Sequence, residues 1–376
     1  MVRMRASVAL VALLSAPLAC LQGCDSDPVE PVHEVLPVGC PGGWQPVSPP
    51  MASALTSGVA YREGNLYVSV GQELISVQVS DGAQAVLSPA RADAIWVEGD
   101  QLLLLGGTYG TQLFSLPVTG GTPTLIADGT AGRTELGIGQ LGSHLPTAID
   151  FFFAESSRVS FTDPTTVWRA PRTGGPPTEL ARFTELDAAD DSALVFEGVA
   201  LAPEGLVLGA SWGVGKVVPL DGGSPQTLAV PEVDNVLGDI DFVGVDARGV
   251  YWAVKDRDVH PAVGDQLVIS PADGGAVRPV WSQIPAYSYL SHAWPDGAGG
   301  LVLVGGQFFR GETFGRTTVW SLDANGAARR LACSPEDTFI TDRLPAIAPD
   351  AFYFVALMGS PMGSQKQLVR VLRAAP

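Results

Sequence analysis

Five side chains that could carry chemistry recur at matching places along this chain. Each falls near the beginning of a short strand expected to be innermost in its repeat unit: Asp93, Asp150, Glu197, Asp241 and His292. Carboxylates that converge on one point could bind a cation, hold a polar ligand, or have raised pKa values suited to acid–base catalysis. The alternative is that they hydrogen-bond to neighbouring backbone groups and trapped water. Either interpretation requires a scaffold that brings the five positions together.

Other combinations of reactive residues give weaker signals. Residues 209–213 read GASWG and fit the G-x-S-x-G pattern, with Ser211 in the place of the nucleophile. That motif operates at a sharp turn from a strand into a helix, and no helix is expected after it here. The sequence therefore does not favour a serine hydrolase.

Metal-binding patterns are sparse. The four histidines are scattered, no two of them are spaced i, i+4, and no C-x-x-C occurs, so zinc is disfavoured. Asp187, Asp190 and Asp191 cluster in one expected loop and could hold calcium through oxygen ligands, with a solvated acidic loop as the alternative. We therefore expect no cofactor, with Ca²⁺ as the alternative.

A short phrase that recurs seven times indicates the scaffold. Residues 119–127 read TGGTPTLIA, residues 173–181 TGGPPTELA and residues 221–229 DGGSPQTLA, and weaker copies begin at Pro41, Ser80, Asp273 and Ala324. Each copy combines a tight glycine turn with a short strand. Repeats at periods of roughly 40–55 residues are typical of propellers and similar arrays.

The surroundings of each phrase predict four strands per unit and hence an all-β propeller of four-stranded blades. Seven blades are expected, with six or eight as alternatives. The last unit has three strands, ending with residues 367–373, and Trp44 to Val47 supplies a candidate for the missing fourth. An N-terminal strand that completes the last blade would remove two open sheet edges at once.

The repeats resemble bacterial propellers related to YWTD and TolB-like repeats. The stretch that carries the resemblance is Val250-Tyr251-Trp252 followed by Asp273-Gly274-Gly275, and the repeat-level match covers most of the chain after its first residues. The resemblance implies the fold and says little about activity.

The first residues have the pattern of a targeting segment. Arg3 and Arg5 precede an apolar stretch, residues 6–19, that is too short to span a bilayer, and Leu21-Gln22-Gly23-Cys24 looks like a bacterial lipobox. The alternatives are an ordinary secretory signal, or Cys20 as the acylated residue. We expect a signal peptide over residues 1–23, a flexible tether over 24–39 and a single propeller domain over 40–376.

Export and lipidation determine how the other cysteines are interpreted. With Cys20 removed and Cys24 acylated, Cys40 and Cys333 remain, and an even pair in an oxidising compartment favours a disulfide. Two unpaired buried thiols are the alternative. The expected location is the cell envelope, periplasmic or on the outer surface, with attachment through the lipid anchor only.

The net charge of the chain and the lengths of its connections indicate which kinds of partner it could bind, and on which face. The formal net charge of −17 repels nucleic-acid backbones and anionic lipid surfaces. Connections on one face are short, whereas those on the other are long and variable, as binding surfaces on rigid scaffolds usually are. Aromatic residues occur in or beside these long connections: Tyr109, Trp212, Tyr287, Tyr289, Phe308 and Phe309.

These observations favour a non-catalytic, lipid-anchored protein that binds a protein or glycan through its long-loop face or serves as a scaffold. The first alternative is a metal-dependent hydrolase or lactonase with the acids at the channel mouth. The second is a structural component of the envelope. No nucleophile, base and orienting residue occur together, which disfavours an enzyme.

Overall fold

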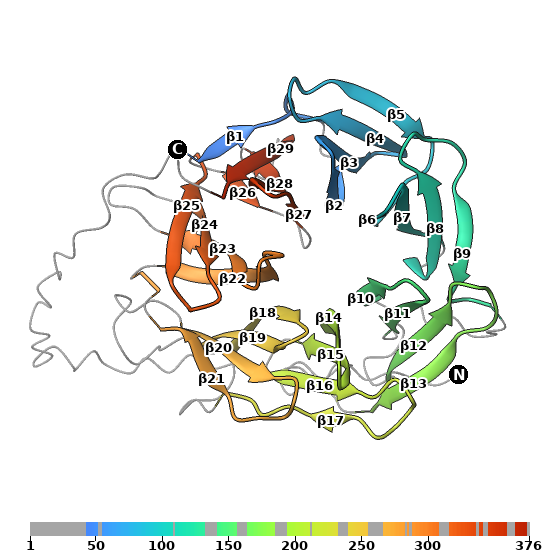
Figure 1. Ribbon diagram of the computed structural model, residues 1–376, viewed down its shortest axis with the longest axis vertical. Coiled ribbons are helices and arrows are strands. Elements are labelled where there is room, and N and C mark those ends of the chain that lie inside the picture. The colour runs from blue at the N-terminus through green and yellow to red at the C-terminus, as the bar shows by residue number, and fades with distance from the viewer. Residues whose placement is uncertain are drawn as a thin grey trace, which may run out of the picture. The chain divides into compact units, whose positions relative to one another are not determined.

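A computed structural model provides the structure of this chain. It describes residues 43–51, 55–107, 110–131, 141–155, 164–184, 194–210, 213–231, 240–254, 266–282, 284–285, 288–307, 316–335, 338–340, 345–358 and 365–373. In these parts of the chain no helix has the length and apolar character needed to cross a bilayer. The described elements are strands, in seven antiparallel sheets that follow one another around a ring (Figure 1).

The first three sheets each take four consecutive strands of the chain. Blade 1 consists of β2 (Leu55–Arg62), β3 (Asn65–Val70), β4 (Glu73–Gln78) and β5 (Gln84–Ser88). Blade 2 consists of β6 (Ala94–Glu98), β7 (Gln101–Gly106), β8 (Gln112–Pro117) and β9 (Thr124–Asp128). Blade 3 consists of β10 (Leu141–Pro146), β11 (Asp150–Glu155), β12 (Thr165–Pro171) and β13 (Thr178–Phe183).

The next three sheets repeat this order. Blade 4 consists of β14 (Phe196–Ala202), β15 (Gly205–Ala210), β16 (Val214–Val218) and β17 (Gln226–Thr227). Blade 5 consists of β18 (Ile240–Asp246), β19 (Gly249–Val254), β20 (Gln266–Pro271) and β21 (Arg278–Trp281). Blade 6 consists of β22 (Ser288–Pro295), β23 (Leu301–Gln307), β24 (Arg316–Leu322) and β25 (Ala328–Cys333).

Blade 7 joins the two ends of the propeller. Its innermost strand has two segments, β26 (Thr338–Ile340) and β27 (Ala346–Ile347), and both pair with β28 (Ala351–Met358), which pairs with β29 (Gln365–Leu372). The outermost strand is β1 (Trp44–Pro46), with Trp44 opposite Val371 (Figure 1). The predicted closure by an N-terminal strand and the predicted count of seven blades are both confirmed.

The strand order separates two kinds of connection. Because neighbouring strands are antiparallel, the turns from first to second and from third to fourth strand lie on one face, which we call the short-turn face. The connections from second to third strand and from each blade to the next leave from the opposite face, which we call the long-loop face. The longest connections leave from the long-loop face, as predicted, but those from β3 to β4 (residues 71–72) and from β15 to β16 (residues 211–213) are short and lie on the same face.

The hydrophobic core is divided among the seven blade interfaces, with one cluster of buried side chains at each. The second strand of each blade contributes side chains to the hydrophobic clusters on both sides of that blade. In β7, Leu102 and Leu104 pack against blade 1, whereas Leu103 and Leu105 pack against blade 3. A strand buried on both faces must be apolar at every position, which explains its continuous apolar run.

The repeated glycine turn has a geometric cause. The first glycine of the phrase has a φ between 73° and 93° in six blades: Gly82, Gly120, Gly174, Gly222, Gly274 and Gly326. Side chains disfavour this left-handed backbone. At Gly120 a Cβ would also lie 2.7 Å from the carbonyl oxygen of Leu87, in the outer strand of the preceding blade. Glycine is therefore required both by the turn and by the contact between blades.

Candidate functional site

The innermost strands surround the axis of the ring, and their first residues lie on the long-loop face. The sequence predicted that five polar residues would meet there. The structure places Asp93, Glu197, Asp241 and His292 in or next to innermost strands, and Asp150 elsewhere. The five positions therefore do not form one set.

Asp150 lies on the short-turn face. The expected innermost strand, residues 150–153, is the beginning of β11, the second strand of blade 3, because β10 occupies the innermost place. The side chain is buried, and its carboxylate lies 2.8 Å from the guanidinium of Arg169. Its backbone N–H donates a hydrogen bond to the hydroxyl oxygen of Thr147, and the same hydroxyl group donates one to the Asp150 carbonyl. These contacts give Asp150 a structural role.

Asp93 lies immediately before β6, on the long-loop face as predicted. Its carboxylate is 3.3 Å from the guanidinium of Arg91, two residues earlier in the chain. Its backbone N–H donates to the carbonyl of Leu105 and extends the pairing of β6 with β7. Because the adjacent arginine offsets the charge of Asp93, this blade contributes little net negative charge.

Glu197, Asp241 and His292 lie in the innermost strands of three consecutive blades. Asp241 pairs with Ala253, and His292 pairs with Val304. Each of these partners lies in the second strand of its blade, four residues after the glycine that ends the turn between the first and second strands. Glu197 is exposed at an irregularity of β14, opposite Gly209 and Ala210. The three side chains therefore originate at nearly the same level, and this part of the predicted set is brought together.

The ring of His292 has an aromatic neighbour. It stacks on Trp294 with ring centroids 5.1 Å apart and an interplanar angle of 3°. Its Nδ1 lies 3.0 Å from the hydroxyl oxygen of Ser291. Trp294 in turn packs against Phe354 of blade 7. His292 therefore combines a polar ring edge with a stacked aromatic face.

Two exposed aromatic residues extend this surface to blades 6 and 7. Tyr289 and Phe339 are each the second residue of an innermost strand, and their side chains are 42% and 38% exposed. We call Glu197, Asp241, His292, Tyr289 and Phe339 the inner-rim surface. Sequence reasoning named Tyr289 as an aromatic beside a long loop but missed Phe339, because the short strand β26 has no recognisable pattern.

The other candidates for chemistry are only partly described. Ala210 ends β15 and Val214 begins β16, so the G-x-S-x-G segment connects two strands rather than a strand and a helix, while Ser211 itself lies outside the described residues. The calcium candidates Asp187, Asp190 and Asp191 also lie outside them, as do Tyr109, Trp212, Tyr287, Phe308 and Phe309. Among the residues that the structure describes, no three His, Cys, Asp or Glu side chains are grouped as metal ligands.

The short-turn face is occupied by contacts between blades. The guanidinium of Arg172 donates to both carboxylate oxygens of Glu98, at 2.9 and 2.6 Å, and this bond lowers the pKa of Glu98. Arg62 reaches the Asp100 carboxylate in blade 2, and Arg373 reaches the backbone of Asp296 in blade 6. These arginines join neighbouring turns, so this face serves the scaffold.

Asp246, Arg248 and Tyr251 form a further contact on this face, in which Asp246 and Tyr251 are buried. The guanidinium of Arg248 contacts the Asp246 carboxylate at 2.5 Å and donates to the carbonyl of Gly299 in blade 6 at 2.8 Å. The hydroxyl of Tyr251 donates to the same carboxylate at 3.0 Å. Burial, together with the negative charge of Asp246, raises the pKa of Tyr251 above its usual range.

The residues of the predicted anchor and disulfide are only partly visible. Cys24 and Cys40 lie outside the described residues, whereas Cys333 is buried at the end of β25. Gly43 lies so close to β25 that a Cβ on it would be 2.5 Å from the carbonyl oxygen of Leu331. The chain three residues after Cys40 is therefore next to the strand that ends at Cys333.

This topology defines a seven-bladed β-propeller, which confirms the resemblance to propeller repeats at the level of the fold. Neither the protein-family models nor the curated proteins give a match. Among solved structures, YCF48 bound to D1 peptide is 10% identical with a TM-score of 0.50, over 90% of this chain and 100% of that one. A likeness at this level of identity shows the fold alone.

Two further solved structures have lower TM-scores. The nidogen/laminin complex is 15% identical over 71% of this chain and 95% of that one, with a TM-score of 0.39. A luciferin-regenerating enzyme is 11% identical over 89% of this chain and 95% of that one, with a TM-score of 0.43.

Proposed function

We propose that this chain is a non-catalytic binding protein whose inner-rim surface recognises a basic segment of a partner protein. The observation that carries the proposal is that the innermost strands of four consecutive blades supply two kinds of side chain. Glu197 and Asp241 supply carboxylates on blades 4 and 5, and Tyr289 and Phe339 supply exposed aromatic faces on blades 6 and 7. Lysine and arginine side chains bind both.

The negative net charge of the whole molecule also favours a basic partner. The formal net charge of −17 attracts basic proteins over a distance set by ionic strength. On the short-turn face, Arg62, Arg172 and Arg373 are engaged in contacts between blades. A solved propeller with a TM-score of 0.50 holds a peptide, as its name "YCF48 bound to D1 peptide" says, which agrees with peptide binding by this fold.

A peptide array tests this proposal. Purified protein is applied to immobilised twelve-residue peptides whose lysine and arginine content varies at random. We expect bound peptides to be enriched in basic residues. The double variant Glu197→Gln with Asp241→Asn should lose this enrichment, and Tyr289→Ala with Phe339→Ala should weaken binding by about tenfold.

The control variants are on the short-turn face. Glu204→Gln removes an exposed carboxylate from the same blade as Glu197, and Ile149→Ala removes an apolar side chain that is 68% exposed. Both should bind as the wild type does. Enrichment in acidic peptides, or equal losses in the control and inner-rim variants, would contradict the proposal.

We further propose that residues 1–23 are a lipoprotein signal, that Cys24 is acylated, and that residues 24–39 tether the propeller to the cell envelope, in the periplasm or on the outer surface. The support is the lipobox-like segment Leu21 to Cys24. Changing Cys24 to Ala should move the protein from the membrane fraction to the supernatant. Release by Cys20→Ala instead would show that the wrong cysteine was chosen.

A disulfide between Cys40 and Cys333 is proposed from the position of Gly43. Three extended residues span about 10 Å, so Cys40 can reach the end of β25. A bond there would fasten the closing strand and, in the chain-entropy model, could contribute up to about 5 kcal/mol. Non-reducing mass spectrometry of a proteolytic digest should find the two peptides linked, and a free Cys333 thiol would refute the pairing.

A further inference from the structure

Blade 5 departs from the repeat at one position. The last residue of the repeated phrase pairs with the third strand in every blade where this pairing is described, and it is Ser88, Ala127, Ala181 and Ala332 in blades 1, 2, 3 and 6. In blade 5 the same place is taken by Trp281, which pairs with Leu267. Comparison with the other repeats therefore shows that Trp281 is much larger than the residues at the same place in the other blades.

The residue that Trp281 faces in blade 6 makes this large side chain unusual. At the interface of blades 2 and 3, Trp168 of the third strand packs on a cluster that contains the small Ala127. The equivalent of Trp168 in blade 6 is Trp320, and it faces Trp281 with ring centroids 6.0 Å apart and an interplanar angle of 62°. A large side chain opposite a small one fills such an interface, whereas two large indoles face each other between blades 5 and 6.

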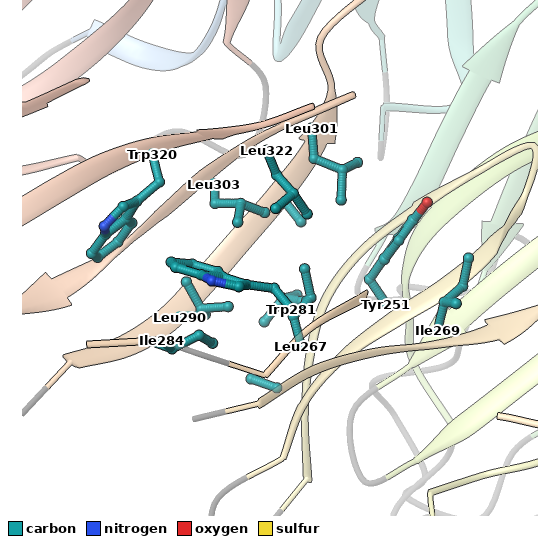
Figure 2. Close-up of a cluster of buried hydrophobic side chains, with 13 residues drawn as sticks. Tyr251, Leu267, Ile269, Trp281, Ile284, Leu290, Leu301, Leu303, Trp320 and Leu322 are labelled. Carbon is teal, nitrogen blue, oxygen red and sulfur yellow. The ribbon is translucent and has the colours of Figure 1, made fainter. Parts of the chain in front are cut away.

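A groove of about 710 Å³ lies beside the two indoles, at the outer side of blades 5 and 6. Its lining includes Val280, Trp281, Ser282, Trp320, Asn325 and Arg330. Figure 2 shows the two indoles next to each other, with Leu303, Leu290 and Ile284 around Trp281. Two of the lining residues, Gly326 and Val280, approach each other across the blades, since a Cβ on Gly326 would lie 3.3 Å from the carbonyl oxygen of Val280.

The groove is positively charged within an acidic protein. Arg330 pairs with Trp320 across the sheet and so projects on the same side toward blade 5. Arg278 pairs with Ile269, whose side chain faces blade 6, and so lies on the same side of blade 5 as the groove without lining it. None of the described residues that line the groove is acidic. Arg330 is half-buried, and this burial lowers the pKa of its guanidinium.

We propose that this groove binds a small organic anion that has a planar, apolar body and a carboxylate. Val280 and the accessible part of Trp281, which is 8% exposed, contact the body, with Trp320 buried behind them at 1% exposure. Arg330 pairs with the carboxylate, and Ser282 and Asn325 are hydrogen-bonding groups of the lining. The volume lies within the range of about 300–1,000 Å³ typical of small-molecule sites. A protein partner would need about 800 Å² of surface on each side, which is more than one groove of this volume offers.

The test uses 2-naphthoate as the probe, in isothermal titration calorimetry with the full-length protein. Two analogues separate the parts of the ligand: 2-naphthylmethanol lacks the charge, and acetate lacks the body. We expect 2-naphthoate to bind with an affinity that falls as salt is added, and both analogues to bind about tenfold or more weakly. No heat from 2-naphthoate at millimolar concentrations would overturn the proposal.

Variants locate the binding. Arg330→Gln should weaken 2-naphthoate binding by about tenfold or more. Arg329→Gln is the matched control, because Arg329 pairs with Ser321 and is exposed. Trp281→Ala restores the residue of the other repeats and should also abolish binding, with thermal unfolding checked in parallel. Equal losses in the two arginine variants, or full binding in both Arg330→Gln and Trp281→Ala, would overturn the assignment.

Discussion

Single buried side chains in this propeller set how its stability depends on pH. His144 in β10 stacks on Phe151 with centroids 5.9 Å apart and forms a hydrogen bond with the backbone of Gly110. Its Nε2 is buried without a hydrogen-bond partner. Because the charged ring would lose its hydration there, burial lowers the pKa of His144 to about 4.

Replacing His144 by Phe should therefore flatten the decrease of stability with acid. In the unfolded chain the imidazole takes up a proton below its usual pKa of 6.5, whereas the folded ring stays neutral until about 4. The wild type should lose up to about 2 kcal/mol of unfolding free energy between about pH 6.5 and pH 5 from this group, and the variant should not. Urea unfolding at both pH values measures the difference, and parallel slopes for the two proteins would contradict it.

Arg248 offers a second test at this scale, because removing its guanidinium leaves the buried Asp246 carboxylate with hydrogen bonds from the Tyr251 hydroxyl and the backbone N–H of residue 248 but without this counter-charge. Arg248→Met should lower the unfolding free energy by about 1–3 kcal/mol, less than for a fully buried pair because Arg248 is partly exposed. Arg329→Met, which changes an exposed arginine, is the control and should change little. Chemical denaturation of both variants gives the comparison, and equal stabilities would show that the contact contributes nothing.

The positions of the candidate residues could be predicted only where the sequence shows clearly at which residue a strand begins. Asp241 and His292 were aligned correctly because each precedes a strongly apolar second strand whose beginning is clear. Asp150 was misplaced because β10 combines His144, Leu145 and Pro146 without alternation, so the apolar β11 was taken for the innermost strand. Bulges in the innermost strands, as at Glu197, also shift side chains in ways that periodicity does not show.

Among the elements, the short strand β1 has the largest topological effect. It contributes three residues, yet the carbonyl and the hydroxyl oxygen of Ser48 just beyond it accept hydrogen bonds from Gln367 and Leu368 of β29. Trp44 packs against the core between blades 6 and 7. The outer edge of β29 is thus covered.

Deleting residues 43–48 should open the ring. The variant would expose the outer edge of β29 and lose the packing of Trp44, so we expect a clear decrease in the melting temperature and concentration-dependent association. Trp44→Ala alone keeps the strand and should cost about 2–3 kcal/mol without association. Size-exclusion chromatography and thermal unfolding separate these outcomes. A deletion variant that stays monomeric with an unchanged melting temperature would show that closure is dispensable.

The elements themselves were largely predictable, because two repeated signals coincide. The glycine turn requires a left-handed backbone, and the second strand must be apolar at every position. Together they locate the second, third and fourth strands of most blades. The groove between blades 5 and 6 was not predictable, even though Trp281 departs visibly from the repeat, because its consequence depends on Trp320 in the facing blade.

At the scale of the whole molecule, the seven interface clusters form a closed cycle in which each blade supports two neighbours. Loosening one interface should therefore destabilise all blades together. Leu104→Ala between blades 1 and 2 and Phe354→Ala between blades 6 and 7 should each lower the unfolding free energy by about 2–5 kcal/mol.

The measurement is whether two spectroscopic probes report the same unfolding transition. Tryptophan fluorescence and far-ultraviolet circular dichroism should give a single transition that moves as a whole in both variants. A second transition that either substitution leaves in place would show that the blades unfold independently. Arg329→Gln again serves as the unperturbed comparison.

The pairing of β1 with β29 also has a consequence in time. Gln45 and Arg370, which are hydrogen-bonded to each other, are 325 positions apart. At an elongation rate of about 5–20 residues per second, roughly 15–65 seconds pass between the synthesis of the two strands. During that interval the growing chain is an open array with a bare edge, and a chain interrupted before β29 never leaves that state. The nascent protein therefore depends on whatever delays aggregation until its last strand arrives.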